Sequence, residues 1–394
     1  MHIFCTMNIE SVKDQAVLEV FNEYFKRVKD PRQQSKVEHL LNEILFITVL
    51  AVIAGADDFN EIAEYAIKKQ SWLKSFLKLP RGIPSHDTFN RVICMIDAGE
   101  FQHCFIDWMH DIRSALPDFP GDDVINLDGK TVRNSEDMAD NKKAIHMVSA
   151  LASKYGLVLG QQKCYEKSNE ITAIPALLKI LLVEGSIITI DAMGCQKNIA
   201  KTIRSKKADY ILAVKANQGN LHHEIVDMFE KVTKPGFAHF IHSVDDQVDK
   251  DHGRIESRKC VSIENLGWLF EIQQWQDARS ISKITATVIR KGKETVEDRY
   301  YISSLPGNAA LMNRAVRKHW NIENKLHWVL DVLFKEDYCR VRTGNGAENL
   351  TTIRKIALNT FKMDQTEPCS LKIKRKRAAW NDNYALMIIS KMKA

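Results

Sequence analysis

The sequence lacks the features that mark several specialised classes of protein. Only 17 of its 394 residues are glycine and 9 are proline, and it contains no internal repeat. This excludes collagen-like, disordered and rod-like coiled-coil chains. The longest apolar run, residues 44–56, has thirteen residues, whereas a membrane-spanning helix needs about twenty. Residues 1–15 lack the basic, apolar and small-residue pattern of a secretory signal. We therefore expect no membrane partner and a cytoplasmic location.

Paired cysteines and a strong charge of one sign are also absent. The eight cysteines include no Cys-x-x-Cys pair, and no histidine lies at zinc-site spacing from them. We therefore expect reduced and mostly buried thiols. Lys and Arg total 56 against 50 Asp and Glu, a net charge of +6. Such a mild positive charge permits a polyanionic partner without requiring one.

The first part of the chain is predicted to be helical. Residues 12–116 carry apolar residues at three- and four-residue spacing almost throughout. Within them, residues 59–77 and 85–97 predict two helices separated by the turn-forming LPRGIP, and Ser85 can cap the second helix. This pair is either a DNA-reading helix-turn-helix unit or two packed helices of a bundle.

The second part of the chain, beyond a break at residues 116–123, has a mixed pattern. Three antiparallel strands followed by alternating helices and strands point to a mixed α/β sheet. Residues 237–304 are again strand-rich, which indicates an inserted β region, and residues 307–334 predict one long helix. The strands of the main sheet are predicted at residues 124–128, 144–153, 157–165, 186–191 and 209–216.

Two aspartates end apolar strands in the same sequence setting. Asp128 ends VINLD, Asp191 ends SIITID, and each is followed by a glycine within three positions. Adjacent strands that carry an acid at matching ends bring two carboxylates together. The alternative for each aspartate alone is a turn former or a helix cap.

A third acid, Glu323, lies on the margin of the apolar stripe of the predicted long helix, one turn from His319 and His327. Such a glutamate can lean over the sheet edge, or it can be a solvated residue paired with lysine. Three carboxylates within a few Å repel one another unless a cation neutralises them, and oxygen ligands suit Mg²⁺ or Mn²⁺. Two such ions about 4 Å apart can activate a water or hydroxyl against a phosphodiester. Zinc is disfavoured because the His-Glu-x-x-His motif is missing.

The ordered set INLDGK, ITIDAMG and RKHWNIENKLHWVLDVLFKED resembles the DDE transposases of insertion sequences, in particular the H-repeat-associated group linked to Rhs elements. The stretch through GIPSHDTFNRV resembles that group's helical associated domain. YILAVKANQ, DHGRIESR, RYYISSL and AENLTTIRKIALN resemble its later blocks. The resemblance implies a ribonuclease-H-like core in which Asp128, Asp191 and Glu323 hold two Mg²⁺ or Mn²⁺ ions.

The resemblance also implies an organisation and an activity. Residues 1–118 would form a helical DNA-binding or associated domain, residues 119–380 the core with its insertion at about 237–304, and residues 381–394 a C-terminal tail. The implied activity is metal-dependent cleavage at insertion-sequence ends and strand transfer into target DNA. The partners would be the double-stranded terminal inverted repeats and target DNA, bound by a homo-oligomer on the nucleoid. The alternatives are a metal-dependent nuclease without strand transfer and an inactive or domesticated DNA-binding copy.

The chain departs from the pattern of related transposases around Glu323. Their signature places Tyr, Arg and Lys where this chain has Val316, His319 and Leu330. The resemblance therefore does not extend to a hairpin intermediate or a base-flipping step that depends on those side chains. Glu336 and Asp337 are nearby acids that are alternatives to Glu323 as the third ligand.

Several polar residues are candidates for holding the phosphate backbone. Each one can equally be a solvated surface residue, but together they would reduce repulsion between the acids and DNA and make binding salt-dependent. The basic run KIKRKR, residues 372–377, is either a DNA-gripping tail or a soluble terminus. The candidates are Lys130, Arg133, Lys215, Asn217, Arg254, Arg258, His319, Arg340 and Arg342.

Overall fold

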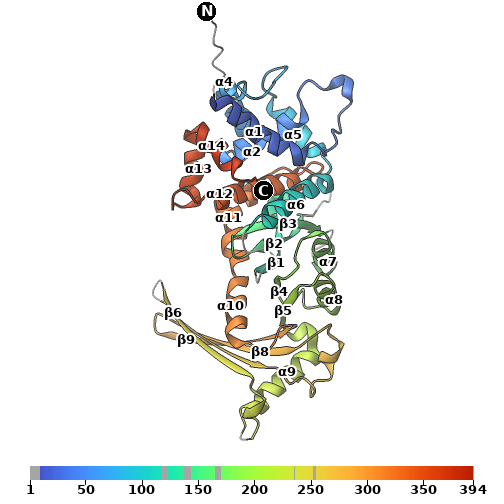
Figure 1. Ribbon diagram of the computed structural model, residues 1–394, viewed down its shortest axis with the longest axis vertical. Coiled ribbons are helices and arrows are strands. Elements are labelled where there is room, and N and C mark those ends of the chain that lie inside the picture. Colours follow the sequence, from blue (N-terminus) through green and yellow to red (C-terminus); the bar gives the residue numbers. More distant parts are fainter. Residues whose placement is uncertain are drawn as a thin grey trace, which may run out of the picture.

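The structure is a computed structural model that describes residues 9–116, 123–136, 143–164, 170–234, 236–251 and 254–393. Figure 1 shows a helical part at one end, a sheet with its covering helices in the middle, and a curved extension of that sheet at the other end. Among the described residues, no helix combines the length and the apolarity that crossing a membrane requires. The seven described cysteines are free and six of them are buried, as expected for structural thiols.

Helices from both ends of the chain build the helical part (Figure 1). At its centre, α2 (Leu41–Ala54) is apolar on all sides, and its residues 43–53 are buried. The second helix predicted beside LPRGIP is present as α5, capped by the Ser85 hydroxyl, but the first is shorter than predicted: α3, capped by Asp58, ends at Lys68, and α4 follows it. The other helices are α1 (Ile9–Phe25), α3 (Phe59–Lys68), α4 (Gln70–Leu73), α5 (His86–Met95), α6 (Ala98–Ser114), α12 (Gly346–Met363), α13 (Leu371–Trp380) and α14 (Asp382–Ser390).

The basic run and the C-terminal segment differ from the expected soluble or DNA-gripping tail. Residues 372–377 lie in α13, where Lys374 and Arg375 are buried. Lys374 donates to the carbonyl of Phe361 at 3.0 Å, and Arg375 pairs with Asp57 at 2.7 Å. Residues 382–390 form α14, which packs on α1, α2 and α12. Two of the five basic side chains of the run therefore stabilise the fold instead of facing solvent.

Five strands form the central sheet, and their order is β3-β2-β1-β4-β5. β1, β2 and β3 are antiparallel, whereas β1, β4 and β5 are parallel. This mixed topology is the ribonuclease-H-like arrangement expected from the sequence, so the predicted fold class is confirmed. The strands are β1 (Val124–Thr131), β2 (His146–Ala152), β3 (Leu157–Cys164), β4 (Ile187–Ile190) and β5 (Asp209–Val214).

The strand-rich residues after β5 continue the same sheet. β9 pairs antiparallel with β5, and β8, β7 and β6 follow in turn, which gives nine strands in one sheet. They form the curved extension in Figure 1. The added strands are β6 (Ser243–Asp251), β7 (Arg254–Ile263), β8 (Ser280–Arg290) and β9 (Lys293–Ser303).

Helices cover the two faces of the sheet in different ways. α7 (Glu170–Ile180), α8 (Lys197–Ser205) and α9 (Gly219–Val232) share one apolar core with the sheet. α10 (Ala309–His319) crosses the other face and packs through Met312 and Ala315 on Val124 and Ile187. The face under α10 is the one that carries the acidic side chains described below.

The predicted long helix is interrupted. After α10 the chain forms a π-helical turn over Glu323–His327 and then the short α11 (Trp328–Val332). A π turn adds a residue to the helical turn, and such turns occur frequently at functional sites. The apolar stripe continues through it, because Ile322, Leu326 and Val329 are all buried. Periodicity alone therefore could not distinguish this segment from a regular helix.

Candidate metal centre

Asp128 and Asp191 lie side by side where the parallel pairing of the central strands β1 and β4 ends. The last Cα partners of the parallel β1–β4 pair are Leu127 and Ile190, and each aspartate follows directly. Neighbouring strands are about 4.8 Å apart, so the two backbones are close at this point. Side chains alternate along a strand. Asp128 therefore shares the face of Val124, and Asp191 the face of Ile187, which is the face under α10.

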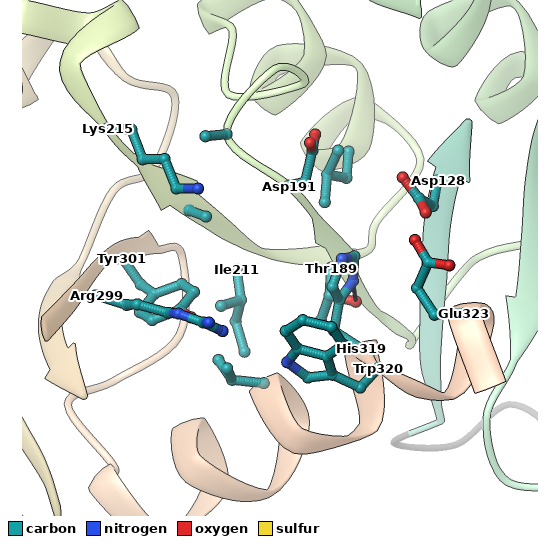
Figure 2. A pocket seen from close by; sticks show the side chains of 14 residues that line it. Asp128, Thr189, Asp191, Ile211, Lys215, Arg299, Tyr301, His319, Trp320 and Glu323 are labelled. Atoms are coloured by element: carbon teal, nitrogen blue, oxygen red, sulfur yellow. Dashed lines mark hydrogen bonds between the residues drawn. The ribbon is translucent and has the colours of Figure 1, made fainter. Parts of the chain in front are cut away.

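Glu323 reaches the same place from the π turn. Figure 2 shows its carboxylate pointing at that of Asp128, with Asp191 to one side on the neighbouring strand. His327 completes the arrangement: its Nδ1 lies 3.6 Å from Oδ2 of Asp128 and 3.5 Å from Oε2 of Glu323. We call Asp128, Asp191 and Glu323 the acidic cluster. The structure thus brings the three predicted acids to one place.

The carboxyl groups of Asp128 and Glu323 have strongly perturbed pKa values. Burial raises the pKa of Asp128 to about 8, and the neighbouring carboxylates of Glu323 and Asp191 add to this effect. The hydrogen bond with His327 lowers the pKa of Glu323 to about 2, against the opposing effect of burial. Without a cation, a proton on Asp128 relieves the repulsion between the carboxylates.

Asp191 is fixed by its own backbone turn. Its Oδ1 accepts hydrogen bonds from the N–H groups of Met193 at 3.1 Å and Gly194 at 3.3 Å. Burial raises the pKa of Asp191, and the hydrogen bond from Gly194 opposes that effect. The glycine of ITIDAMG has a packing reason as well, since a Cβ there would lie 3.0 Å from Cδ1 of Ile174.

The donor set fits a divalent cation. One ligand atom each from Asp128, Glu323 and His327 can be chosen so that all three lie within 4.8 Å of one another. A cation among them would offset the carboxylate repulsion that raises the pKa of Asp128. Carboxylate oxygens suit Mg²⁺ and Mn²⁺. Within the described residues, Nε2 of His327 is buried without a hydrogen-bond partner, so the ring is oriented by its Nδ1 side alone.

The acidic cluster forms one wall of a cleft of about 240 Å³. Lys215, Arg299 and the half-exposed Trp320 line it away from the acids, as Figure 2 shows. The guanidinium of Arg299 lies over the Trp320 ring, 5.4 Å from its centroid. Arg299 and Trp320 were not predicted from the sequence, and His327 was considered only as a zinc ligand. His327 lies four residues after Glu323, and this spacing could have predicted that the two side chains share one face of the helix.

Of the other predicted residues, His319 and Lys215 line the cleft, whereas Asn217 does not. The imidazole Nδ1 of His319 is 3.0 Å from the Thr189 hydroxyl, and burial lowers the pKa of His319 to about 4. Lys215 is exposed, and Asn217 donates to the carbonyl of Ala192 at 2.6 Å. His319 is therefore a neutral hydrogen-bonding group in this cleft at neutral pH.

Lys130 does not have a free ammonium group. Its Nζ lies 2.7 Å from Asp331, 2.9 Å from Glu336 and 3.1 Å from Asp337. Glu336 and Asp337 are therefore partners of Lys130 in this structure and are not members of the acidic cluster. Lys130 was predicted to contact phosphate. Its largely buried side chain instead holds the segment after α11 against the end of β1.

None of the remaining predicted phosphate contacts whose side chains are described lines the cleft. Arg133 is exposed beside Asp337, and Arg340 is exposed on the segment before α12. Nε of Arg342 donates to the carbonyl of Asn134 at 3.3 Å. Arg258 is buried and pairs with Asp249 at 3.3 Å. Arg254 begins β7, and its side chain lies outside the described part of the structure.

Gly129 packs too closely for any side chain. A Cβ at this position would lie 2.7 Å from Cδ of Glu170, and Oε1 of Glu170 and Nε2 of His146 would be closer still. These two side chains are buried and bonded to each other at 2.5 Å. The glycine of INLDGK is therefore required because the His146–Glu170 pair fills the space beside the strand that carries Asp128.

Comparison with known proteins finds matches over most of the chain. The family described as Transposase DDE domain matches residues 119–360, and the family described as DDE_Tnp_1-associated matches residues 22–109. The putative transposase YncI of Escherichia coli O157:H7 is 43% identical over 387 residues, which cover 96% of this chain and 94% of that protein. The H repeat-associated putative transposase YhhI of Escherichia coli strain K12 is 40% identical over 375 residues, with 93% and 97% covered.

Among solved structures, a chain of a piggyBac transposase synaptic complex with hairpin DNA aligns over 96% of this chain and 80% of that chain. The TM-score is 0.45 and the identity is 11%, so this likeness adds nothing to the assignment. The two relatives cover nearly the whole chain, and the residues matched by the Transposase DDE domain, 119–360, span the positions of all three acids. The chain therefore belongs to the DDE transposase family, and its relatives include the H repeat-associated group.

Proposed function

We propose that the protein cleaves DNA at the ends of an insertion sequence and joins the freed strand to target DNA. The observation that carries this proposal is the convergence of Asp128, Asp191 and Glu323 on the sheet face beneath α10. These acids come from two parallel strands and from a π turn more than a hundred residues further along the chain. A membership in the transposase family supports the same reaction class.

Asp128, Asp191 and Glu323 would hold two divalent ions, Mg²⁺ or Mn²⁺. Such ions, when bound, supply an activated water or hydroxyl and neutralise charge on the leaving oxygen of a phosphodiester. His327 keeps the carboxylates of Asp128 and Glu323 in place through its Nδ1. The backbone hydrogen bonds of Asp191 fix the third carboxylate at the end of the neighbouring strand.

The wall of the cleft opposite the acids would receive the DNA strand. Lys215 supplies an exposed ammonium group there, Arg299 supplies a guanidinium that also pairs with Glu297 at 2.8 Å, and Trp320 supplies an exposed aromatic face. Positive side chains near the cluster offset the repulsion between carboxylates and phosphates. The substrate would be double-stranded DNA, both the terminal inverted repeats and the target, and a homo-oligomer on the nucleoid would bring two ends together.

A cleavage assay with single-residue variants tests the proposal. With Mg²⁺ or Mn²⁺ and DNA that spans an element end, the wild-type protein should nick the DNA, and Asp128→Asn, Asp191→Asn and Glu323→Gln should each abolish nicking. Asp246→Asn, an exposed acid on β6, is the matched control and should cleave normally. Retained cleavage by Glu323→Gln would exclude Glu323 as the third ligand.

The same reactions separate transposition from simple hydrolysis. Supplying supercoiled target DNA should yield a joined product that contains both the element end and the target. Cut ends without any joined product would favour a metal-dependent nuclease. DNA binding without any cutting, under all metal conditions, would favour an inactive copy.

A further inference from the structure

A second cleft lies where the helical part meets the segment that follows α11. It has a volume of about 610 Å³ and is lined by the first turns of α3 and α5 on one side and by residues 335–341 on the other. We call it the α3–α5 groove. Its lining includes residues of α3 and α5, the helices for which the sequence allowed two interpretations, a DNA-reading unit or part of a bundle.

The segment along the groove is anchored to the strand that carries Asp128. Glu336 is buried against Lys130, and Oδ1 of Asp337 accepts hydrogen bonds from Nζ of Lys130 at 3.1 Å and the backbone N–H of Arg133 at 3.3 Å. Asn134 donates to the backbone carbonyl of Asp337. Lys130 and Asp128 lie two residues apart on the same face of β1, so their Cα atoms are about 7 Å apart. The groove and the acidic cluster are therefore neighbouring sites that are both positioned by β1.

The anchored segment presents an aromatic ring and two cations to the groove. Tyr338 is 73% exposed, and Nζ of Lys335 lies 5.6 Å from the centroid of its ring. Lys335 has a φ of 53°, a left-handed conformation that is uncommon for a residue with a side chain. Arg340 is exposed two residues further on. Within the described ranges, neither Lys335 nor Arg340 makes an ion pair with an acid.

The acids that line the groove are already occupied. Oδ1 of Asp57 pairs with Nη2 of Arg375 at 2.7 Å. Asp58 caps α3 by accepting hydrogen bonds from the N–H groups of Asn60 and Glu61 at 2.8 and 2.9 Å. Asp58 keeps its negative charge, so the three cations Lys335, Arg340 and Arg375 exceed the two aspartates by one positive charge, which suits a polyanion.

The polar residues on α5 are suited to a double helix. His86 and Asn90 both line the groove, one helical turn apart on the same face of α5. Asparagine pairs with adenine edges in the major groove, which is wide enough to admit an α-helix. Helix N-terminal residues also contact phosphates and base edges in known helix-turn-helix proteins.

We propose that the α3–α5 groove binds the phosphate backbone of double-stranded DNA that extends from the acidic cluster, with Lys335 and Arg340 as phosphate contacts and Tyr338 beside them. This inference rests on the proposed function, because it assigns a place to the DNA outside the cleft. It gives the helical part of the chain a role in holding the substrate.

The test uses the full-length protein and a mixed-sequence 40-base-pair duplex, with binding measured over a range of salt concentrations. Each phosphate contact that is removed lowers the slope of log affinity against log salt by about 0.9. We expect the double variant Lys335→Gln/Arg340→Gln to lower the slope by about 2. The matched control is Lys201→Gln/Lys231→Gln, two exposed lysines on α8 and α9 on the opposite face of the sheet, and it should keep the wild-type slope. Urea unfolding curves show whether both variants are folded.

Three results would overturn the inference: equal slopes for the wild type and the groove variant, a change seen only with single-stranded DNA, or no binding of the duplex by the wild type. The proposed function fails by a different result, the absence of metal-dependent nicking by the wild type. Asp128→Asn should keep the wild-type salt slope while losing nicking. The two proposals can therefore fail separately.

Discussion

Gly129→Ala is predicted to destabilise the protein and to impair cleavage although it adds only one methyl group. The new Cβ would lie 2.7 Å from Cδ of Glu170 and closer still to Oε1 of Glu170 and Nε2 of His146. Glu170 cannot swing away at low cost, because it is buried and bonded to His146 at 2.5 Å. Either β1 shifts away from α7 or the buried pair separates.

The cost can be bounded from these two routes. Overpacking a core costs typically about 1–3 kcal/mol. Separating the pair leaves a buried carboxylate or imidazole without its partner, which costs about 1–3 kcal/mol. We expect a loss of about 2–4 kcal/mol in the free energy of unfolding, since the two effects are partly alternatives. A shift of β1 would also move Asp128, the residue before Gly129, away from Glu323.

Urea denaturation followed by tryptophan fluorescence measures the loss of stability, and the nicking assay measures the second effect. Gly219→Ala is the control, because a Cβ at Gly219 meets nothing within 4 Å and the residue begins α9 in a helical conformation. It should be neutral or stabilise by up to about 1 kcal/mol. Wild-type stability and wild-type nicking in Gly129→Ala would refute the packing argument.

Two further predictions concern buried charges. Lys130→Met removes the cation that Asp331, Glu336 and Asp337 share, and breaking a buried pair costs about 3–5 kcal/mol; an unchanged urea midpoint would contradict this. Asp364 gives a pH dependence: burial acts to raise its pKa, but hydrogen bonds from Lys391, Thr366 and Tyr384 lower it overall. Because the folded state then binds the proton less readily than the unfolded chain, this stabilisation is complete above pH of about 4 and is lost as the pH falls below it. Asp364→Asn should flatten the acid side of the stability curve, and an identical acid profile in wild type and variant would contradict the assignment.

The strands and two of the acids followed from local sequence patterns. Each strand of the central sheet contains a short apolar run, and bringing Asp128 and Asp191 together required only that β1 and β4 be neighbours, although β1 continues past Asp128 to Thr131. Alternation then placed Asp128 and Asp191 on one face. Each of these features depends on residues that are close together within one strand, which is why they could be predicted from the sequence.

Features that depend on distant contacts were not accessible in the same way. The π turn at Glu323 leaves the apolar periodicity nearly unchanged, so a regular helix was predicted. Lys374 and Arg375 are buried by contacts with Phe361 and with Asp57, and the latter lies more than 300 residues away. A basic run carries no local sign that a remote acid will pair with it. Arg299 likewise gains its place in the cleft only because β9 pairs with β5.

The central claim is that the acidic cluster binds divalent cations, and titration with Mn²⁺ tests it most directly. Calorimetry or the loss of free-ion paramagnetic resonance should detect Mn²⁺ binding to the wild-type protein. Asp128→Asn, Asp191→Asn and Glu323→Gln should each weaken that binding at least about tenfold, a loss of about 1.4 kcal/mol, while Asp246→Asn binds as the wild type does. Equal Mn²⁺ affinity in the wild type and in all three cluster variants would contradict the account.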